Sequence, residues 1–231
     1  MDTVAIILAG GSGERLPGYL PKQFLEIGGR TLLEICLERF QNHAGVDGIV
    51  LVCPAPHRQR AEEIAAAFSR VVKVTSGGKR RQESSAIGVG AVPAAARNIL
   101  IHDAARALVP AGVIGRVLAA LKDNAAVMPV VPVRDTIVRL EDGETVTAVL
   151  DREMFRRVQT PQGFRSEVIR QAHELAAREG FVQASDDCSL VLRYGLAPVV
   201  TVAGDAANIK VTAPPDMELA EALLRQVKSK A

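Results

Sequence analysis

Glycines and cations follow an apolar run near the start of the chain. Residues 4–8 (VAIIL) have the length and the β-branched content of a buried strand, and residues 10–13 (GGSG) follow almost at once. Glycines let a backbone turn sharply and leave its N–H groups uncovered, and such N–H groups at the carboxyl end of a strand bind phosphate oxygens. Arg15 and Lys22 add positive charge. This phosphate loop therefore predicts a nucleotide site; the simpler interpretation is a glycine-rich turn with two solvated cations.

Two common phosphate-binding patterns do not fit this loop. A P-loop ends in Gly-Lys-Ser/Thr, whereas Gly13 is followed by Glu14 and Arg15. A dinucleotide-binding motif needs a third glycine three positions after Gly13, where Leu16 stands. What remains is G-G-x-G-x-R followed by P-K-Q at residues 21–23. This pattern resembles the loop of sugar-nucleotide pyrophosphorylases and nucleotidyltransferases.

The composition indicates one α/β domain covering residues 1–231. A net charge of +2 is too small for a nucleic-acid-binding surface, and 3% aromatic residues leave few side chains for stacking on bases. The three cysteines form no C-x-x-C pair and the four histidines show no metal-ligand spacing. No charged and apolar leader opens the sequence, and no apolar run reaches the roughly 18 residues of a membrane span. We expect a cytoplasmic protein that binds neither nucleic acid nor membranes.

Strand-like and helix-like patterns alternate along most of the chain. The predicted strands are 4–8, 48–52, 71–75, 99–101, 126–133 and 199–202. The predicted helices are 32–40, 61–68, a small-residue helix after 84, 114–121, 168–180, 186–194 and 217–227. The alternation predicts right-handed βαβ units, hence a Rossmann-like, mainly parallel twisted sheet with helices on both faces. Thr31 and Glu34 form a capping-box pattern, and Pro129 and Pro132 place the tail of the strand 126–133 at an edge.

Residues 134–158 interrupt this rhythm, and we call this segment the arm. Two short apolar segments, 137–140 and 146–150, flank Asp142-Gly143, and Asp-Gly is a strong hairpin signal. An isolated hairpin is marginally stable in water and has two unpaired edges. Our hypothesis is that the arm packs on a second copy of the chain and forms a homodimer. The alternative is a hairpin that lies on its own sheet.

Polar clusters stand where predicted strands end. They are His102-Asp103 with Arg106, Arg134-Asp135-Thr136, and Asn208-Ile209-Lys210-Val211-Thr212. Ligands of open α/β sheets bind beyond the carboxyl ends of the strands, so we expect these clusters to converge on the phosphate loop. Simpler interpretations stay open: Asp103 caps a helix or pairs with Arg106, and Lys210 is a surface lysine. The simpler interpretation of Asp151 and Arg152 is a local salt bridge between the two side chains.

Several motifs, in order, resemble those of the 2-C-methyl-D-erythritol 4-phosphate cytidylyltransferase family. They are LAGGSGERLPGYLPKQF (8–24), HDAAR (102–106), PVRDT (132–136), DR (151–152), QTPQGF (159–164), SDD (185–187) and NIKVT (208–212). The family joins CTP to methylerythritol phosphate in the non-mevalonate isoprenoid pathway. The match spans nearly the whole chain. This sequence departs from the family pattern at Ala107 (usually proline), Ser185 (often threonine) and Ala207 (often acidic).

The resemblance implies a role for residues in each motif. The implied catalytic cations around the triphosphate are Arg15, Lys22 and Lys210. The implied nucleotide-binding residues are Ala9, Gly10, Gly11, Ser12, Gly13, Gly77, Gly78, Ser84 and Asp103. The implied residues for the methylerythritol phosphate, some reaching across a dimer, are Arg106, Thr136, Arg152, Thr160 and Thr212. A Mg²⁺ ion is implied as cofactor, held by Asp103 or by the CTP phosphates alone.

Other functions remain open on the sequence. A cytidylyltransferase for another polyol phosphate, such as ribitol 5-phosphate, would share the fold and most of the motifs. A protein of another class would bind CTP without turnover. A nicotinamide-dependent dehydrogenase is disfavoured, because the third glycine of its motif is absent.

Overall fold

The computed structural model describes residues 1–10 and 21–228. The strands are β1 (Thr3–Leu8), β2 (Glu26–Ile27), β3 (Arg30–Thr31), β4 (Gly48–Cys53), β5 (Val71–Ser76), β6 (Asn98–Asp103), β7 (Ala126–Pro132), β8 (Ile137–Leu140), β9 (Val146–Leu150), β10 (Arg156–Val158), β11 (Gln162–Arg165) and β12 (Val199–Ala203). The helices are α1 (Leu32–Gln41), α2 (Arg58–Ala65), α3 (Arg81–Ala91), α4 (Ala111–Ala120), α5 (Ser166–Glu179), α6 (Asp187–Arg193) and α7 (Pro214–Lys228). The predictions for Gly11, Ser12, Gly13 and Arg15 lie outside the described residues.

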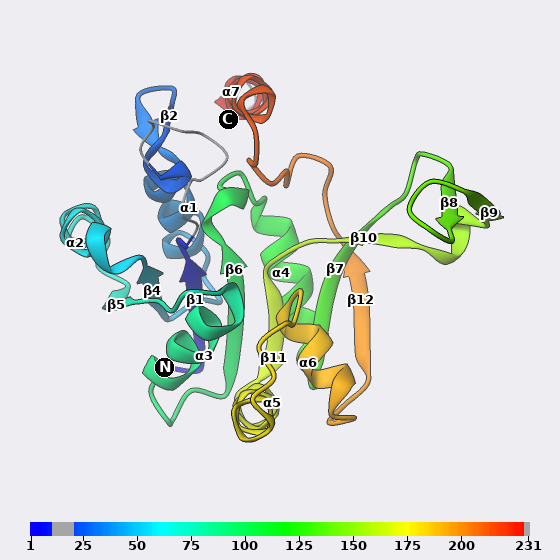
Figure 1. Ribbon diagram of the computed structural model, residues 1–231. Helices are drawn as coiled ribbons and strands as arrows, with labels where there is room; N and C mark the ends of the chain where they lie inside the picture. Colours follow the sequence, from blue (N-terminus) through cyan, green and yellow to red (C-terminus); the bar gives the residue numbers. More distant parts are fainter. Residues whose placement is uncertain (11–20, 229–231) are drawn as a thin grey trace.

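A mixed, mainly parallel sheet forms the centre of the fold (Figure 1). Strand β1 lies between β4 and β6, and β5 continues the sheet beyond β4, all in parallel. On the other side of β6, β11 runs antiparallel between β6 and β7, and β12 pairs in parallel with β7. This arrangement confirms the predicted α/β nucleotidyltransferase-type fold.

Side chains of β1 alternate between the two faces of the sheet, as the pleat of a strand requires. Val4, Ile6 and Leu8 pack in a cluster with buried residues of α3, α5 and α6. Ala5 and Ile7 pack in a second cluster with residues of α1, α2, α4 and α7. Because both faces are covered, β1 is buried along its whole length. Its carboxyl end is thereby fixed where the phosphate loop begins.

Local sequence signals set several element boundaries as predicted. The Thr31 hydroxyl accepts from the backbone N–H of Glu34 at 3.1 Å, and the Thr31 N–H donates to the Glu34 carboxylate at 2.7 Å, which completes the capping box of α1. Gly180 ends α5 with φ of 71°, a left-handed conformation that glycine adopts without strain. Cys36 is buried within α1.

The edge position predicted for the tail of β7 is confirmed for its last two residues, Val131 and Pro132. β12 pairs with β7 only as far as Val130, so beyond this residue β7 pairs with β10 alone among the described strands, whereas Pro129 lies inside the sheet. The carbonyl of Pro129 accepts from the N–H of Gln159 at 2.8 Å, at the break between β10 and β11. In an extended strand the N–H and C=O of one residue point to the same side. The N–H group that Pro129 lacks would therefore point to this break, so its absence removes no hydrogen bond between paired strands.

The β8–β9 hairpin of the arm leaves the body of the molecule and forms its own two-stranded sheet, whereas the last residues of the arm form β10 of the central sheet (Figure 1). At its tip the Asp142 carboxylate accepts from the N–H groups of Glu144 at 3.0 Å and Thr145 at 2.7 Å, and Gly143 has φ of 89°. The predicted hairpin and its Asp-Gly turn are thus confirmed. The alternative, a hairpin resting on the central sheet, does not hold.

Candidate active site

Backbone at the ends of β1 and β5 meets the start of α3. A Cβ on Gly10 would lie 3.9 Å from the Ser84 hydroxyl oxygen, and a Cβ on Gly77 would lie only 2.6 Å from it. Gly77 therefore allows a close approach that a side chain would prevent. The Ser84 hydroxyl also lies 3.4 Å from the Gly78 carbonyl, and Ala9 is buried with its N–H bonded to β4. The nucleotide-binding residues predicted within the described chain thus come together, apart from Asp103, which lies at the neighbouring strand end.

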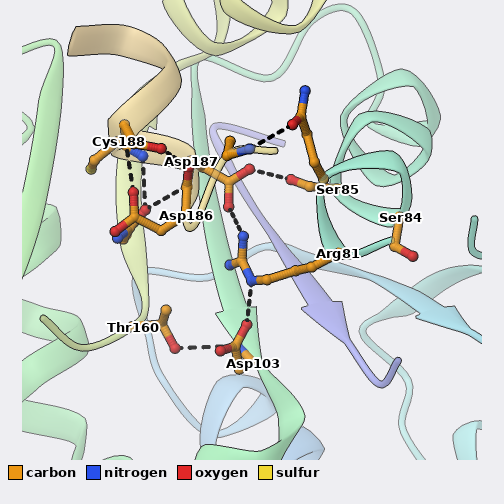
Figure 2. A network of polar contacts seen from close by, with 12 residues as sticks. Arg81, Ser84, Ser85, Asp103, Thr160, Asp186, Asp187 and Cys188 are labelled. Atoms are coloured by element: carbon orange, nitrogen blue, oxygen red, sulfur yellow. Dashed lines mark hydrogen bonds and ion pairs between the residues drawn. The ribbon is translucent and has the colours of Figure 1, made fainter. Parts of the chain in front are cut away.

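Asp103, the last residue of β6, is held by two cations, Arg81 (Figure 2) and Lys210. Arg81 Nε lies 3.0 Å from Oδ1, and Lys210 Nζ lies 2.7 Å from Oδ2. Burial by itself would raise the pKa of the Asp103 carboxyl, but the charges of Arg81 and Lys210 outweigh it and hold the pKa well below its usual value. The carboxylate is therefore ionised at neutral pH. The simpler interpretations are wrong: within the described residues Asp103 accepts no capping bond, and it pairs with Arg81 and Lys210 rather than with Arg106.

Lys22 and Lys210 approach the same segment from opposite ends of the sequence. Lys22 Nζ donates to the carbonyl of Thr212 at 2.6 Å, two residues beyond Lys210. The Thr212 hydroxyl and N–H both donate to the Asp216 carboxylate, at 2.8 and 2.7 Å, which anchors this segment at the start of α7. Lys22 therefore contacts the segment that carries Lys210, while the Lys210 ammonium itself lies on Asp103.

His102 and Thr160 hold the backbone beneath Asp103. The Thr160 hydroxyl accepts from the N–H of Asp103 at 3.2 Å and lies 3.0 Å from His102 Nδ1. Burial lowers the pKa of His102 to about 4, so its ring is neutral at pH 7. The hydroxyl then donates to Nδ1, and Nε2 carries the proton toward the Arg106 carbonyl, 3.2 Å away. His102 thus serves to hold structure and is engaged on both ring nitrogens.

Arg106 borders a polar cavity of about 160 Å³. Its guanidinium donates to the carbonyls of Asn208 at 2.8 Å and Val158 at 3.2 Å, which joins three separate segments. The lining side chains are Arg81, Asp103, Arg106, Val158, Gln159, Thr160, Gln162, Ser185, Asp186 and Lys210. Four predicted site residues therefore share one cavity: Asp103, Arg106, Thr160 and Lys210.

The sequence of this chain is similar to known proteins over nearly its whole length. The family model of 2-C-methyl-D-erythritol 4-phosphate cytidylyltransferase matches residues 3–226. The chain belongs to this family. Relatives with that name include proteins from Thermobifida fusca, 42% identical over 96% of this chain and 92% of the relative, and from Thermus thermophilus, 43% identical over 97% and 98%.

Solved structures of cytidylyltransferases of this family share the fold. The enzyme from Thermus thermophilus superposes with a TM-score of 0.79 at 38% identity, covering 95% of this chain and 98% of that structure. The 4-diphosphocytidyl-2C-methyl-D-erythritol synthase from Anaerococcus prevotii superposes with a TM-score of 0.87 at 28% identity, covering 97% and 96%. The match therefore extends over nearly the whole chain.

Two predicted substrate-binding residues lie on the arm and away from the cavity of their own chain. Thr136 is exposed, and Arg152 donates to the carbonyl of Arg134 at 2.9 Å. Arg152 lies 3.7 Å from the carboxylate of Glu153, so the simpler interpretation of a salt bridge with Asp151 does not hold. The structure of one chain does not bring Thr136 and Arg152 to the cavity.

The three residues that depart from the family pattern have different surroundings. Ala107 is buried in the core beside α1. Ser185 lines the cavity and keeps a hydroxyl there. The N–H of Ala207 donates to the Asp205 carboxylate at 2.8 Å within the loop that leads to Lys210.

Arg81 and Asp187 belong to the site but were missed as candidates from the sequence. Arg81 Nη1 lies 2.8 Å from the Asp187 carboxylate, which is almost fully buried. The signal for Arg81 was its place directly after the loop that follows β5, at the same sheet edge as Asp103. Asp187 stood in the SDD motif, but no local pattern indicated that it would be buried against an arginine.

We expect the stability of the fold to fall at acid pH, in part through Asp187. Burial would raise the pKa of this carboxyl, but Arg81 and the hydrogen bonds from His173 and Ser85 lower it to about 2. A carboxyl with a lowered folded-state pKa stabilises the fold above its unfolded-state pKa, near 3.9, and the stabilisation is lost as the pH falls toward 2. Urea unfolding between pH 5 and pH 2.5 should show this loss. An Asp187→Asn variant should show a shallower decline, and an unchanged slope would contradict the assignment.

No helix within residues 1–10 and 21–228 combines the length and apolar character that crossing a bilayer requires. Nor does this part of the chain contain a group of three or more His, Cys, Asp and Glu side chains placed to hold a metal ion. Asp103 still fits a Mg²⁺ site of the substrate-assisted kind, because Mg²⁺ is commonly held by one or two carboxylates together with substrate phosphates.

Proposed function

We infer that the chain transfers a cytidylyl group from CTP to 2-C-methyl-D-erythritol 4-phosphate and releases pyrophosphate, in the non-mevalonate isoprenoid pathway. The family match over residues 3–226 carries this inference. The cavity shared by Arg106, Lys210 and Asp103 supports it, because Arg and Lys bind phosphate groups and a carboxylate can hold Mg²⁺ beside them. Lys22 contacts the segment that carries Lys210.

The reaction needs no general base. The second pKa of a phosphate monoester is near 6, so the attacking phosphate oxygen is already anionic at pH 7. That oxygen forms a bond to the α-phosphorus of CTP, and the bond from the α-phosphorus to the bridging oxygen breaks as pyrophosphate leaves. His102, the titratable ring next to the site, is neutral and hydrogen-bonded on both sides, which agrees with chemistry that requires no histidine base.

The obstacle is the repulsion between two polyanions. At about 4 Å and an effective dielectric constant near 20, each pair of like unit charges costs roughly 4 kcal/mol. Lys22 and Lys210 are placed to offset this repulsion on the triphosphate, and Arg15 is assigned the same role from the family pattern. Held in advance by Thr212 and Asp103, the two lysines need little reorganisation when charge shifts to the leaving pyrophosphate.

We assign Mg²⁺ as the cofactor, held by Asp103 and the CTP phosphates. The ion would neutralise phosphate charge and polarise the α-phosphoryl group. Asp103 suits this role because its carboxylate is ionised and borders the cavity.

The two substrates would occupy different parts of the site. We assign the backbone around Ala9, Gly10, Gly77 and Gly78, with Ser84, to the nucleoside of CTP, together with Gly11, Ser12 and Gly13 from the family pattern. The methylerythritol phosphate would lie near Arg106, Thr160 and Thr212. The hydroxyls of Thr160 and Thr212 are already hydrogen-bonded to protein groups. These two residues would therefore contribute to substrate binding through their backbone and position rather than through a free hydroxyl.

We propose that the chain is a homodimer through the arm, which brings Thr136 and Arg152 to the site of the second copy. The arm carries a set of exposed apolar side chains. They are Val138, Leu140, Val146, Val149, Met154 and Phe155. Apolar side chains gathered on a projecting hairpin are typical of a surface that is buried in an assembly.

Val149→Glu should weaken this dimer, because it places a charge on an apolar side chain that is 70% exposed in the single chain. Wild-type protein at micromolar concentration should have twice the 24.6 kDa mass of one chain, and the variant should shift toward one chain. Val72→Glu is the matched control, since Val72 lies on β5 at 42% exposure and outside the arm. Wild-type protein that sediments as a single chain would rule the dimer out.

Pyrophosphate release tests the proposed function directly. CTP with 2-C-methyl-D-erythritol 4-phosphate should release pyrophosphate, and ATP, GTP and UTP should support it poorly. Faster release with ribitol 5-phosphate would favour the other polyol phosphate reaction. Binding of CTP without release of pyrophosphate from any pair would favour a non-catalytic CTP-binding protein. The cytoplasmic location, and the expected lack of nucleic-acid and membrane partners, stay predictions from composition.

A further inference from the structure

A buried carboxylate lies behind the active site and does not border the cavity. The side chain of Asp187, the first residue of α6, is only 1% exposed. It receives Arg81 Nη1 at 2.8 Å and the Ser85 hydroxyl (Figure 2). His173 Nε2 lies 3.3 Å away. A buried charge is tolerated when it is paired and hydrogen-bonded, and Asp187 meets this condition on both oxygens.

Arg81 connects this buried carboxylate to the catalytic one. Its guanidinium donates from Nη1 to Asp187 and from Nε to Asp103 Oδ1 at 3.0 Å, so one planar group bridges two carboxylates (Figure 2). Lys210 holds the other oxygen of Asp103 at 2.7 Å. The result is an alternating row of charges, Asp187, Arg81, Asp103 and Lys210, that links α6, the start of α3 and the end of β6.

The surroundings of each side chain show which member of this row positions the others. Asp187 is fixed inside the protein by its further bonds to Ser85 and His173, whereas the side chain of Lys210 is 43% exposed. A guanidinium is planar and rigid, so anchoring Nη1 also sets where Nε points. Asp187 therefore fixes Arg81, and Arg81 fixes the orientation of the Asp103 carboxylate.

A structural role alone explains this arrangement poorly. Buried ion pairs are often no more stabilising than apolar side chains of similar volume, so their presence is weak evidence of a contribution to stability. The row ends at Asp103 and Lys210, the two groups that the proposed function places on the metal and the triphosphate. Small displacements of such groups cost much of the rate, because catalysis depends on oriented charges.

We propose that Asp187 and Arg81 are positioning residues, which hold the Asp103 carboxylate and, through it, the Lys210 ammonium in the orientation that the reaction requires. This inference rests on the proposed function. Neither residue is assigned contact with the reacting atoms. Their effect should therefore appear in kcat, with a smaller change in the KM for CTP.

The test compares Asp187→Asn, Arg81→Ala and the double variant with wild-type protein in the pyrophosphate assay. Each single variant should lower kcat roughly 10- to 100-fold, the usual effect of losing a group that orients a catalytic ligand. The double variant should be little worse than either single one, because both act through the same contact. Glu62→Gln and Arg58→Ala, from an exposed ion pair on α2, are the matched controls and should leave kcat unchanged.

Chemical rescue separates positioning from a general loss of structure. Arg81 borders the cavity and its side chain is 26% exposed, so free guanidinium can enter the space left in Arg81→Ala. Guanidinium chloride at low millimolar concentration should restore kcat several-fold in Arg81→Ala. It should do so much less in the double variant, where one of the two carboxylates that would hold it is missing. If Asp187→Asn does not fold, the guanidinium rescue of Arg81→Ala alone tests the positioning role.

Wild-type kcat in a folded Asp187→Asn variant, or failure of guanidinium to raise the activity of Arg81→Ala, would overturn the inference. A wild-type protein that released no pyrophosphate would refute the proposed function instead. In that case a crystal structure of the Asp187→Asn variant would decide the inference. An unmoved Asp103 carboxylate would then contradict the positioning role, and a displaced one would support it.

Discussion

Lys22→Ala is expected to lower kcat roughly 100- to 1,000-fold, the range seen when a preorganised group that stabilises transition-state charge is removed. The Lys22 ammonium lies 2.6 Å from the Thr212 carbonyl, at the segment that carries Lys210. Its loss leaves the triphosphate with one compact cation fewer where negative charge develops. Pyrophosphate release and the melting temperature, measured on the same preparation, check the result.

The fold should tolerate this change, because Lys22 is only half-buried and lies in a single turn of 3-10 helix. Lys122→Ala is the matched control, since Lys122 is exposed at the end of α4 and belongs to no site motif. Lys22→Arg should also be impaired, because a planar guanidinium cannot take the place of a compact ammonium in a confined site. Near-wild-type turnover in a folded Lys22→Ala protein would refute the assignment.

Arg152→Ala should reduce kcat by at least about 100-fold if the arm completes the site of a second copy. In one chain Arg152 lies on the arm, bonded to the Arg134 carbonyl, and apart from the cavity that holds Asp103 and Arg106. Its loss should therefore leave CTP binding to the same chain unchanged. Calorimetric titration with CTP and the pyrophosphate assay separate these two effects.

Mixing two inactive variants gives the sharper result. Lys22→Ala and Arg152→Ala chains, allowed to exchange subunits, form heterodimers in which one site has both residues intact. Random exchange makes half of the dimers mixed, so activity should return to roughly a quarter of the wild-type value. No recovery after exchange, confirmed by mass, would show that Arg152 acts within its own chain or not at all.

Sequence patterns predicted the local features of the fold well, because short-range interactions set them. The capping box of Thr31 and Glu34 involves residues three apart, and the Asp-Gly turn at Asp142 is satisfied by backbone N–H groups two and three residues on. The complete burial of β1 was indicated by its continuous apolar run, whose side chains alternate between two covered faces of the sheet. The prolines of β7 correctly indicated an edge at the tail of the strand, but Pro129 lies inside the sheet. Proline excludes only its own N–H from pairing, and the tertiary structure placed that position at a gap between β10 and β11.

Sequence by itself determined the family, most of the strands and helices in their order, and the residue types that handle phosphate, because these follow from motifs and spacing within short segments. It did not predict the short strands β2, β3, β10 and β11. Only the tertiary structure decided which charges meet. Lys210 pairs with Asp103 across 107 positions, and Arg81 pairs with Asp187 across 106, so no periodicity along the chain records either contact. Those contacts exist because parallel strands end at a common edge of the sheet, where α3 and α6 begin, and packing of the two helices on one face brings the charges together.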